Sequence, residues 1–214
     1  MTLNRQKVLF DTKFLDPDAI KTVKKINKSG YEAYLVGGCI RDLLLGYEPK
    51  DFDIATNATP EQIRKIFKRS RIIGRRFKLV HVIFSARKFI EVATFRSSKN
   101  NKIATKGMIL RDNYYGSLKD DVFRRDFTVN GLYYDLKKSE VIDYVGGLND
   151  LKKLKIDMIG NPSERFEEDP VRMIRAVRFK VKLRASIDSK LSNKIAKNAY
   201  LISNVPPARL YEEV

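Results

Sequence analysis

Two neighbouring stretches decide the expected fold: Leu35-Val-Gly-Gly-Cys-Ile-Arg-Asp42 and Lys50-Asp-Phe-Asp-Ile-Ala-Thr56. In the first, two glycines separate a predicted strand from a predicted helix, so that backbone N–H groups and the helix N-terminus can face a phosphate. Arg41, one turn into that helix, could bind the same phosphate through its forked guanidinium group. A Gly-Gly turn alone is more often just a tight turn.

Asp51 and Asp53 stand two positions apart on a predicted strand, so their side chains share one face of it. Two adjacent carboxylates repel each other unless a cation lies between them, and oxygen ligands suit Mg²⁺. Glu91, on the later predicted strand 89–95, is a candidate third carboxylate, and the alternative is an outward-facing edge residue. An isolated Asp-x-Asp is usually a solvated strand end, but this one follows a phosphate-type turn.

Hydrophobic periodicity places strands in the first two thirds of the chain and helices in the last third. We therefore expect an α+β head at 1–160, with a mixed or antiparallel sheet, followed by an all-α segment at 161–214. Residues 97–116 are polar and aperiodic, which indicates a loop. The predicted helices are 16–30, 39–45, 57–67, 118–134, 169–183 and 187–202, with a new start at 206–207. The predicted strands are 31–36, 51–55, 71–74, 79–84, 89–95, 141–144 and 156–159.

The charge balance points to a polyanionic partner. The 214 residues carry 43 Lys+Arg against 26 Asp+Glu, a formal net charge of +17. Such a basic excess most commonly indicates nucleic acid binding, and the alternative is a lysine-rich composition such as that of 21–28.

The remaining composition indicates the compartment. One cysteine, Cys39, excludes an internal disulfide framework, and a single histidine, His81, argues against a Cys/His zinc site. No run approaches the roughly 18 apolar residues of a membrane helix, and 1–11 lacks the apolar stretch of a secretory signal. We therefore expect a cytoplasmic protein.

Five ordered motifs resemble those of the tRNA nucleotidyltransferase/poly(A) polymerase family, in its bacterial branch, over nearly the whole chain. They are Gly37-Gly38-x-x-Arg41-Asp42 with Asp51-x-Asp53, Arg124-Arg-Asp-Phe-Thr-Val-Asn130, Asp143-Tyr-Val-Gly-Gly-Leu-Asn-Asp150, Glu168-Asp-Pro-Val-Arg172 and Arg175-Ala-Val-Arg-Phe179. The resemblance implies a palm-type nucleotidyltransferase head and a helical neck, with the third motif as the hinge between them.

The resemblance also implies a mechanism. Two Mg²⁺ ions would activate an RNA 3′-hydroxyl and clamp the triphosphate of ATP, so that AMP is transferred and pyrophosphate leaves. The metal ligands would be Asp51, Asp53 and Glu91. Phosphates would be held by Gly37, Gly38, Arg41 and Arg125. Asp126 would position the sugar or complete the acidic site.

Base recognition is assigned by the resemblance to Asp169 and Arg172. The helix beneath them would contribute Arg175 and Arg178 to nucleotide binding. Asp169 and Arg172 are three apart on a predicted helix and hence neighbours on one face, so a carboxylate acceptor and a guanidinium donor can read a base edge together. Without the family, the same pair would be an ordinary surface ion pair.

The stretch Ile72-Ile-Gly-Arg-Arg-Phe-Lys-Leu-Val-His-Val82 resembles the one that marks bacterial poly(A) polymerases against CCA-adding enzymes. Its paired arginines would form a cationic patch, and His81 is more often a packed strand histidine than a catalytic one. We therefore expect a template-independent adenylyltransferase acting on RNA 3′ ends with ATP. The alternatives are a CCA-adding tRNA nucleotidyltransferase and a truncated, non-catalytic RNA-binding remnant, because 206–214 begins a helix that the chain does not finish.

Overall fold

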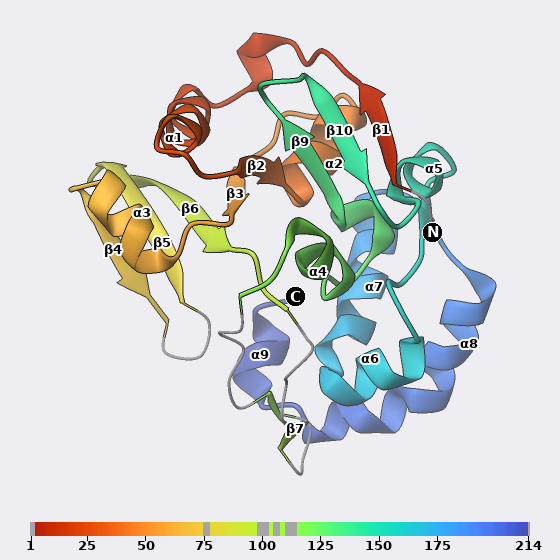
Figure 1. The fold of residues 1–214 in the computed structure, drawn as a ribbon. Coiled ribbons are helices and arrows are strands. Elements are labelled where there is room, and N and C mark those ends of the chain that lie inside the picture. Colours follow the sequence, from red (N-terminus) through yellow and green to blue (C-terminus); the bar gives the residue numbers. More distant parts are fainter. Residues whose placement is uncertain (1–2, 75–77, 98–102, 105–107, 110–114, 214) are drawn as a thin grey trace.

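The computed structural model describes residues 3–74, 78–97, 103–104, 108–109 and 115–213. At its centre lies an eight-stranded sheet in the order β1-β10-β9-β2-β3-β6-β5-β4 (Figure 1). Strands β3 and β6 are parallel, and the other neighbours are antiparallel, so the expected mixed sheet is confirmed. The strands are β1 (Asn4–Lys7), β2 (Ala33–Val36), β3 (Asp53–Thr56), β4 (Ser70–Ile73), β5 (Leu79–Ser85), β6 (Lys88–Thr94), β9 (Leu132–Asp135) and β10 (Glu140–Asp143).

Helices cover both faces of this sheet. Because side chains alternate along a strand, Ile54 of β3 packs in the same hydrophobic cluster as α1, α2 and α3, while the next residue, Ala55, packs in a second cluster with α4. The sheet therefore has an α1–α3 face and an α4 face. The helices of this part are α1 (Pro17–Lys28), α2 (Gly38–Leu44), α3 (Pro60–Ile66), α4 (Leu118–Phe123) and α5 (Gly147–Lys152).

Two of the predicted helix starts are fixed by local side chains. Asp16 accepts hydrogen bonds from the N–H groups of Asp18 and Ala19 at the start of α1. Thr59 forms a capping box with Gln62 at the start of α3. Each cap satisfies N–H groups that have no partner within the helix. Helix α1 therefore begins after the predicted cap Asp16, and α3 begins at Pro60, inside the predicted range 57–67.

The predicted helix 118–134 is confirmed only at its start, Leu118–Phe123, and is wrong beyond it. Helix α4 ends at Phe123, the 3-10 turn η2 spans Thr128–Asn130, and β9 occupies Leu132–Asp135. The apolar residues of this segment are nearly continuous, so their spacing does not distinguish a helix from a buried strand. The prediction also lacked β1 and α5, and two short strands, β7 (Ile103–Ala104) and β8 (Met108–Ile109), lie within the predicted loop 97–116.

The last quarter of the chain is mainly helical but not entirely so. Strand β12 (Ser186–Ile187) pairs in parallel with β11 (Lys155–Ile156), which corrects the expectation of an all-α segment. The predicted helix 169–183 begins only after Pro170, because Asp169 is extended and ends the preceding helix. The helices are α6 (Pro162–Glu168), α7 (Val171–Lys182), α8 (Ser189–Asn198), η3 (Ala199–Asn204) and α9 (Pro207–Tyr211). Among the described residues, no helix is long and apolar enough to cross a membrane.

Candidate active site

A pair of carboxylates stands beside the N-terminal end of β3. The parallel register places Asp53 directly opposite Glu91 of β6. Both point to the α4 face, because the residues that follow them, Ile54 and Val92, are buried on the other side. Asp51 lies before the strand begins, so the expectation that it shares a strand with Asp53 is wrong.

The electrostatics of Asp53 suit a cation. Removal from water raises its pKa to about 6, and repulsion from Glu91 and Asp51 adds to this effect while Arg125 opposes it. Asp53 nevertheless keeps an exposed surface that an ion can reach.

The donor set also fits Mg²⁺. No group of three or more carboxylate, histidine or cysteine side chains within the described residues is arranged as a complete metal site. Mg²⁺ is commonly bound through one or two carboxylates, with water and substrate phosphates completing its shell. Asp53 and its neighbouring acids therefore fit a magnesium ion that arrives with a nucleotide.

The turn between β2 and α2 brings an arginine next to its glycines. Gly37 has a φ of 80°, and a Cβ atom built there would lie 3.4 Å from Nη1 of Arg125. A side chain at this position would be strained by the left-handed backbone, and its Cβ would already be in van der Waals contact with the guanidinium. The N–H group of Gly37 donates to the carbonyl of Leu132, so that donor is already used within the fold.

Arg41, predicted to bind phosphate, is enclosed by protein groups. Its Nη1 donates to Oδ1 of Asn130 at 2.6 Å, and its Nε donates to Oδ1 of Asp42 at 2.8 Å. Its guanidinium carbon lies 5.1 Å from the ring centre of Phe179. Since the residue is only 3% exposed, this structure places Arg41 as a link between α2, η2 and α7.

A buried carboxylate, Asp121, fixes the two arginines of the second motif. It accepts hydrogen bonds from Nε of Arg124 at 2.8 Å, from Nη2 of Arg125 at 3.2 Å and from the hydroxyl of Tyr133. Burial alone would raise its pKa, but Arg125, Arg124 and these hydrogen bonds bring the pKa of Asp121 down to about 2. The sequence prediction lacked this residue, although its spacing of three and four residues from the arginines on a helix was a usable signal.

Asp126 connects the second motif to α7. Its Oδ2 accepts a hydrogen bond from Nε of Arg175 at 2.9 Å, and its Oδ1 accepts from the N–H group of Phe127 at 2.7 Å. Burial pushes the pKa of Asp126 upward, but Arg175 and these bonds hold it below its usual value. Asp126 is therefore an anion at neutral pH.

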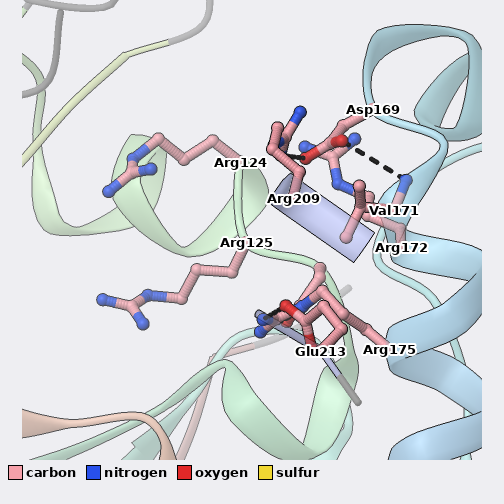
Figure 2. A pocket seen from close by; sticks show the side chains of 9 residues that line it. Arg124, Arg125, Asp169, Val171, Arg172, Arg175, Arg209 and Glu213 are labelled. Atoms are coloured by element: carbon pink, nitrogen blue, oxygen red, sulfur yellow. Dashed lines mark hydrogen bonds and ion pairs between the residues drawn. The ribbon is translucent and has the colours of Figure 1, made fainter. Parts of the chain in front are cut away.

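A pocket of about 270 Å³ lies between the turn after α4 and the helices α6 and α7. Figure 2 shows Arg124 and Arg125 on one side and Arg172 and Arg175 on the other. The lining is dominated by arginine and suits an anionic ligand. The lining residues are Arg124, Arg125, Asp126, Asp169, Val171, Arg172, Arg175, Arg209 and Glu213.

The two residues predicted to read the base both line this pocket, but their side chains do not pair with each other. Asp169 forms an ion pair with Arg209 of α9 at 2.9 Å. Arg172 donates to Oε2 of Glu168 at 2.8 Å and to the carbonyl of Arg165 at 2.7 Å. The expectation that Asp169 and Arg172 lie on one helix is wrong, because the chain leaves the helix at Asp169.

The C-terminal helix α9 and the residues after it supply pocket residues that the sequence prediction lacked. Glu213 forms ion pairs with Arg175 at 2.7 Å and with Arg178 at 2.8 Å. The Arg178 guanidinium also lies 5.1 Å from the ring centre of Phe179. The sequence did contain a signal for these residues. A helix start at Pro206 is followed by Arg209 and Glu213, a charged pair four residues apart that would lie on one face of the helix. The paired arginines of the 72–82 stretch, Arg75 and Arg76, lie outside the described residues.

These features can be compared with known proteins. A family model for the Poly A polymerase head domain matches residues 33–157. The chain belongs to this family of class II nucleotidyltransferases. Within the family, it is 50% identical to poly(A) polymerase I of Escherichia coli O6:H1 over 98% of this chain and 46% of that protein. It is 35% identical to the CCA-adding enzyme of Bacillus pumilus over 89% of this chain and 47% of that protein.

The fold is also that of solved members. The crystal structure of the Bacillus stearothermophilus CCA-adding enzyme in complex with CTP matches with a TM-score of 0.82 and 33% identity, over 93% of this chain and 48% of that one. The chain therefore spans about half the length of the relatives it matches, and the matched half contains the nucleotidyltransferase head.

Proposed function

We propose that this chain carries the catalytic head of an RNA 3′-adenylyltransferase, a poly(A) polymerase that transfers AMP from ATP to an RNA 3′-hydroxyl and releases pyrophosphate. The observation that carries the proposal is the pairing of Asp53 with Glu91 within reach of Arg125 and Gly37. Carboxylates beside a guanidinium and an open glycine turn form a junction of metal ligands and phosphate ligands.

Asp51, Asp53 and Glu91 would hold magnesium, which when bound activates the hydroxyl and stabilises charge on the phosphates. Arg125 would contact the triphosphate and is held in place by Asp121 and Tyr133. The glycine turn keeps the space beside this guanidinium open for the phosphates.

The arginine-lined pocket would receive the nucleotide. Asp126 orients Arg175. Asp169 and Arg172 line the same pocket and would present an acceptor and a donor to the base edge once the nucleotide displaces their present partners. Adenine and cytosine both offer a donor beside an acceptor, so this pair alone does not choose between ATP and CTP.

A second candidate is CCA addition to tRNA. It is supported by the close structural match to a CCA-adding enzyme that binds CTP. Identity favours the first candidate, since it is 50% to a poly(A) polymerase I and 35% to a CCA-adding enzyme over similar lengths. Both candidates use the same carboxylates.

One incubation separates the candidates. The purified chain is mixed with a labelled single-stranded RNA, Mg²⁺ and either ATP, CTP or both, and the products are resolved by length. Adenylyl transfer gives long ladders with ATP alone, whereas CCA addition gives short products on a tRNA that need both nucleotides. Chelation of the metal with EDTA should abolish either reaction.

The metal assignment is tested with Asp53→Asn. We expect a loss of incorporation of about 1,000-fold or more, because metal and triphosphate both depend on this carboxylate, while RNA affinity in the absence of nucleotide changes less than about threefold. Asp135→Asn, a buried carboxylate that caps a turn away from the site, is the matched control. Near-normal extension by Asp53→Asn would disprove the assignment, and RNA binding without incorporation by the unaltered chain would favour the non-catalytic remnant.

A further inference from the structure

The β4–β6 part of the sheet presents an aromatic surface on the α4 face. Phe89 of β6 is 51% exposed, which is unusual for a large apolar side chain on a strand. Its ring stacks on the imidazole of His81 from β5, with ring centres 4.0 Å apart and planes inclined by only 8°. Single exposed apolar residues need no explanation, but this one belongs to an ordered stack.

Strand register connects this stack to the catalytic carboxylates. Arg71 pairs with His81, His81 with Glu91, and Glu91 with Asp53, so the four lie in one row across β4, β5, β6 and β3. All four face the same side, because their neighbours along each strand point into the α1–α3 core. The imidazole Nε2 lies 3.4 Å from Oε2 of Glu91, so the aromatic stack is in direct contact with one of the two carboxylates.

The stack lies close to the carboxylate pair of Asp53 and Glu91. Phe89 precedes Glu91 by two residues on β6, which is roughly 7 Å along the strand. At the edge of the same row Arg71 is exposed, and it has no ion-pair partner among the described residues. An exposed aromatic ring, a planar imidazole behind it and an exposed guanidinium nearby are the elements that single-stranded nucleic acid binding sites combine.

We propose that Phe89, backed by His81, is a stacking platform for an unpaired base near the 3′ end of the RNA primer, with Arg71 contacting the backbone. We assign this surface to RNA and not to a protein partner, because Phe89 lies beside Asp53 and Glu91, where the RNA 3′ end would react. A base stacked on Phe89 leaves the adjoining sugar close to Asp53 and Glu91. The proposal rests on the function proposed above, because it assigns the position of the RNA substrate in the same site.

The first experiment measures RNA binding without metal or nucleotide. A fluorescent single-stranded RNA is titrated with the chain, and affinity is read from anisotropy. We expect Phe89→Ala to weaken binding by about 5- to 150-fold, the range for loss of one base–aromatic stack. Phe89→Trp should retain affinity, and Phe89→Leu should not, because leucine restores apolar volume without a π surface.

The matched control is Tyr200→Ala, which removes an aromatic side chain that is 68% exposed on η3, away from this row. It should leave RNA affinity within about twofold. Melting temperatures of all variants identify any that are unfolded, and since Phe89 and Tyr200 are exposed, little change is expected.

The second experiment locates the base. 2-Aminopurine is placed at the last, second-last or tenth nucleotide from the 3′ end, and its fluorescence is followed on binding. Quenching should be confined to one of the last two positions and be lost in Phe89→Ala but not in Phe89→Trp. Unchanged affinity of Phe89→Ala, equal behaviour of the Leu and Trp variants, or no binding by the unaltered chain would each overturn the proposal. Neither experiment uses ATP or metal. A negative result would therefore overturn the stacking platform without deciding whether the chain incorporates nucleotides.

Discussion

At the residue scale, the site uses aspartates in two opposite electrostatic states. Removal from water, together with the neighbouring acids, raises the pKa of Asp53 to about 6, whereas Arg125 and Arg124 overcome burial and lower the pKa of Asp121 to about 2. Asp53 therefore binds its proton more tightly in the metal-free folded state than in the unfolded state, and it disfavours folding increasingly as the pH rises from about 4 to about 6. Asp121 has the opposite sign and stabilises the fold above pH 4.

Asp121 holds Arg124 and Arg125 as a unit, and its replacement should affect both stability and nucleotide binding. We expect Asp121→Asn to lower the free energy of unfolding at pH 7 by about 2 to 3 kcal/mol, from a pKa difference of about two. The loss should shrink as the pH falls from about 4 toward 2, where the wild-type carboxyl is also protonated. Urea unfolding at several pH values measures this effect.

The same variant should weaken ATP binding by about tenfold, because Arg125 loses an anionic hydrogen-bond partner and is less well positioned. Calorimetric titration with ATP tests this, with Asp135→Asn as the control that perturbs a buried carboxylate elsewhere. If both variants lose stability but neither loses ATP affinity, Asp121 is only a structural residue.

At the element scale, the sequence predicts those features that depend on local chemistry. The starts of α1 and α3 follow from caps, and the glycine turn before α2 follows from the strand–Gly-Gly–helix pattern. The sequence does not predict that β9 lies where the end of the helix 118–134 is expected, or that β12 pairs with β11, because these strands depend on partners distant in the chain. The same holds in the site: Asp53 and Glu91 are adjacent only through β3–β6 pairing, while the contacts of Asp169 depend on α9.

The start of α5 packs so closely against η2 that only glycine fits at the contact. A Cβ atom at Gly147 would lie 2.1 Å from the carbonyl oxygen of Thr128 in η2, the turn that follows Asp126. Gly147→Ala should therefore destabilise the fold by about 3 kcal/mol or more, since backbone cannot give way as a side chain does.

The adjacent Gly146→Ala is the matched control. Gly146 has a φ of 83° and nothing near its missing Cβ, so the cost is only that of left-handed backbone, about 1 to 2 kcal/mol. Urea unfolding of both variants gives the comparison. A smaller loss for Gly147→Ala than for Gly146→Ala would contradict the close contact between α5 and η2.

At the scale of the whole molecule, the predicted boundary near residue 160 follows secondary structure but does not divide the hydrophobic core. Phe166 of α6, Met173 of α7 and Leu191 of α8 belong to the same buried cluster as Val23 of α1 and Leu35 of β2. The pocket likewise takes its walls from both sides of residue 160. We therefore propose that the two predicted parts fold as one cooperative unit, with the nucleotide pocket at their junction.

Phe166→Ala tests this cooperation. The side chain is fully buried, so its loss should cost about 3 to 5 kcal/mol. If the core is shared, amide hydrogen exchange by mass spectrometry should show protection falling by similar amounts in β2 and β9 of the head and in α7. Val181→Ala, at a position that is 72% exposed on α7, should change stability by no more than about 0.5 kcal/mol. Loss of protection confined to residues 162–198, with β2 and β9 unchanged, would instead establish two separately folding domains divided near residue 160.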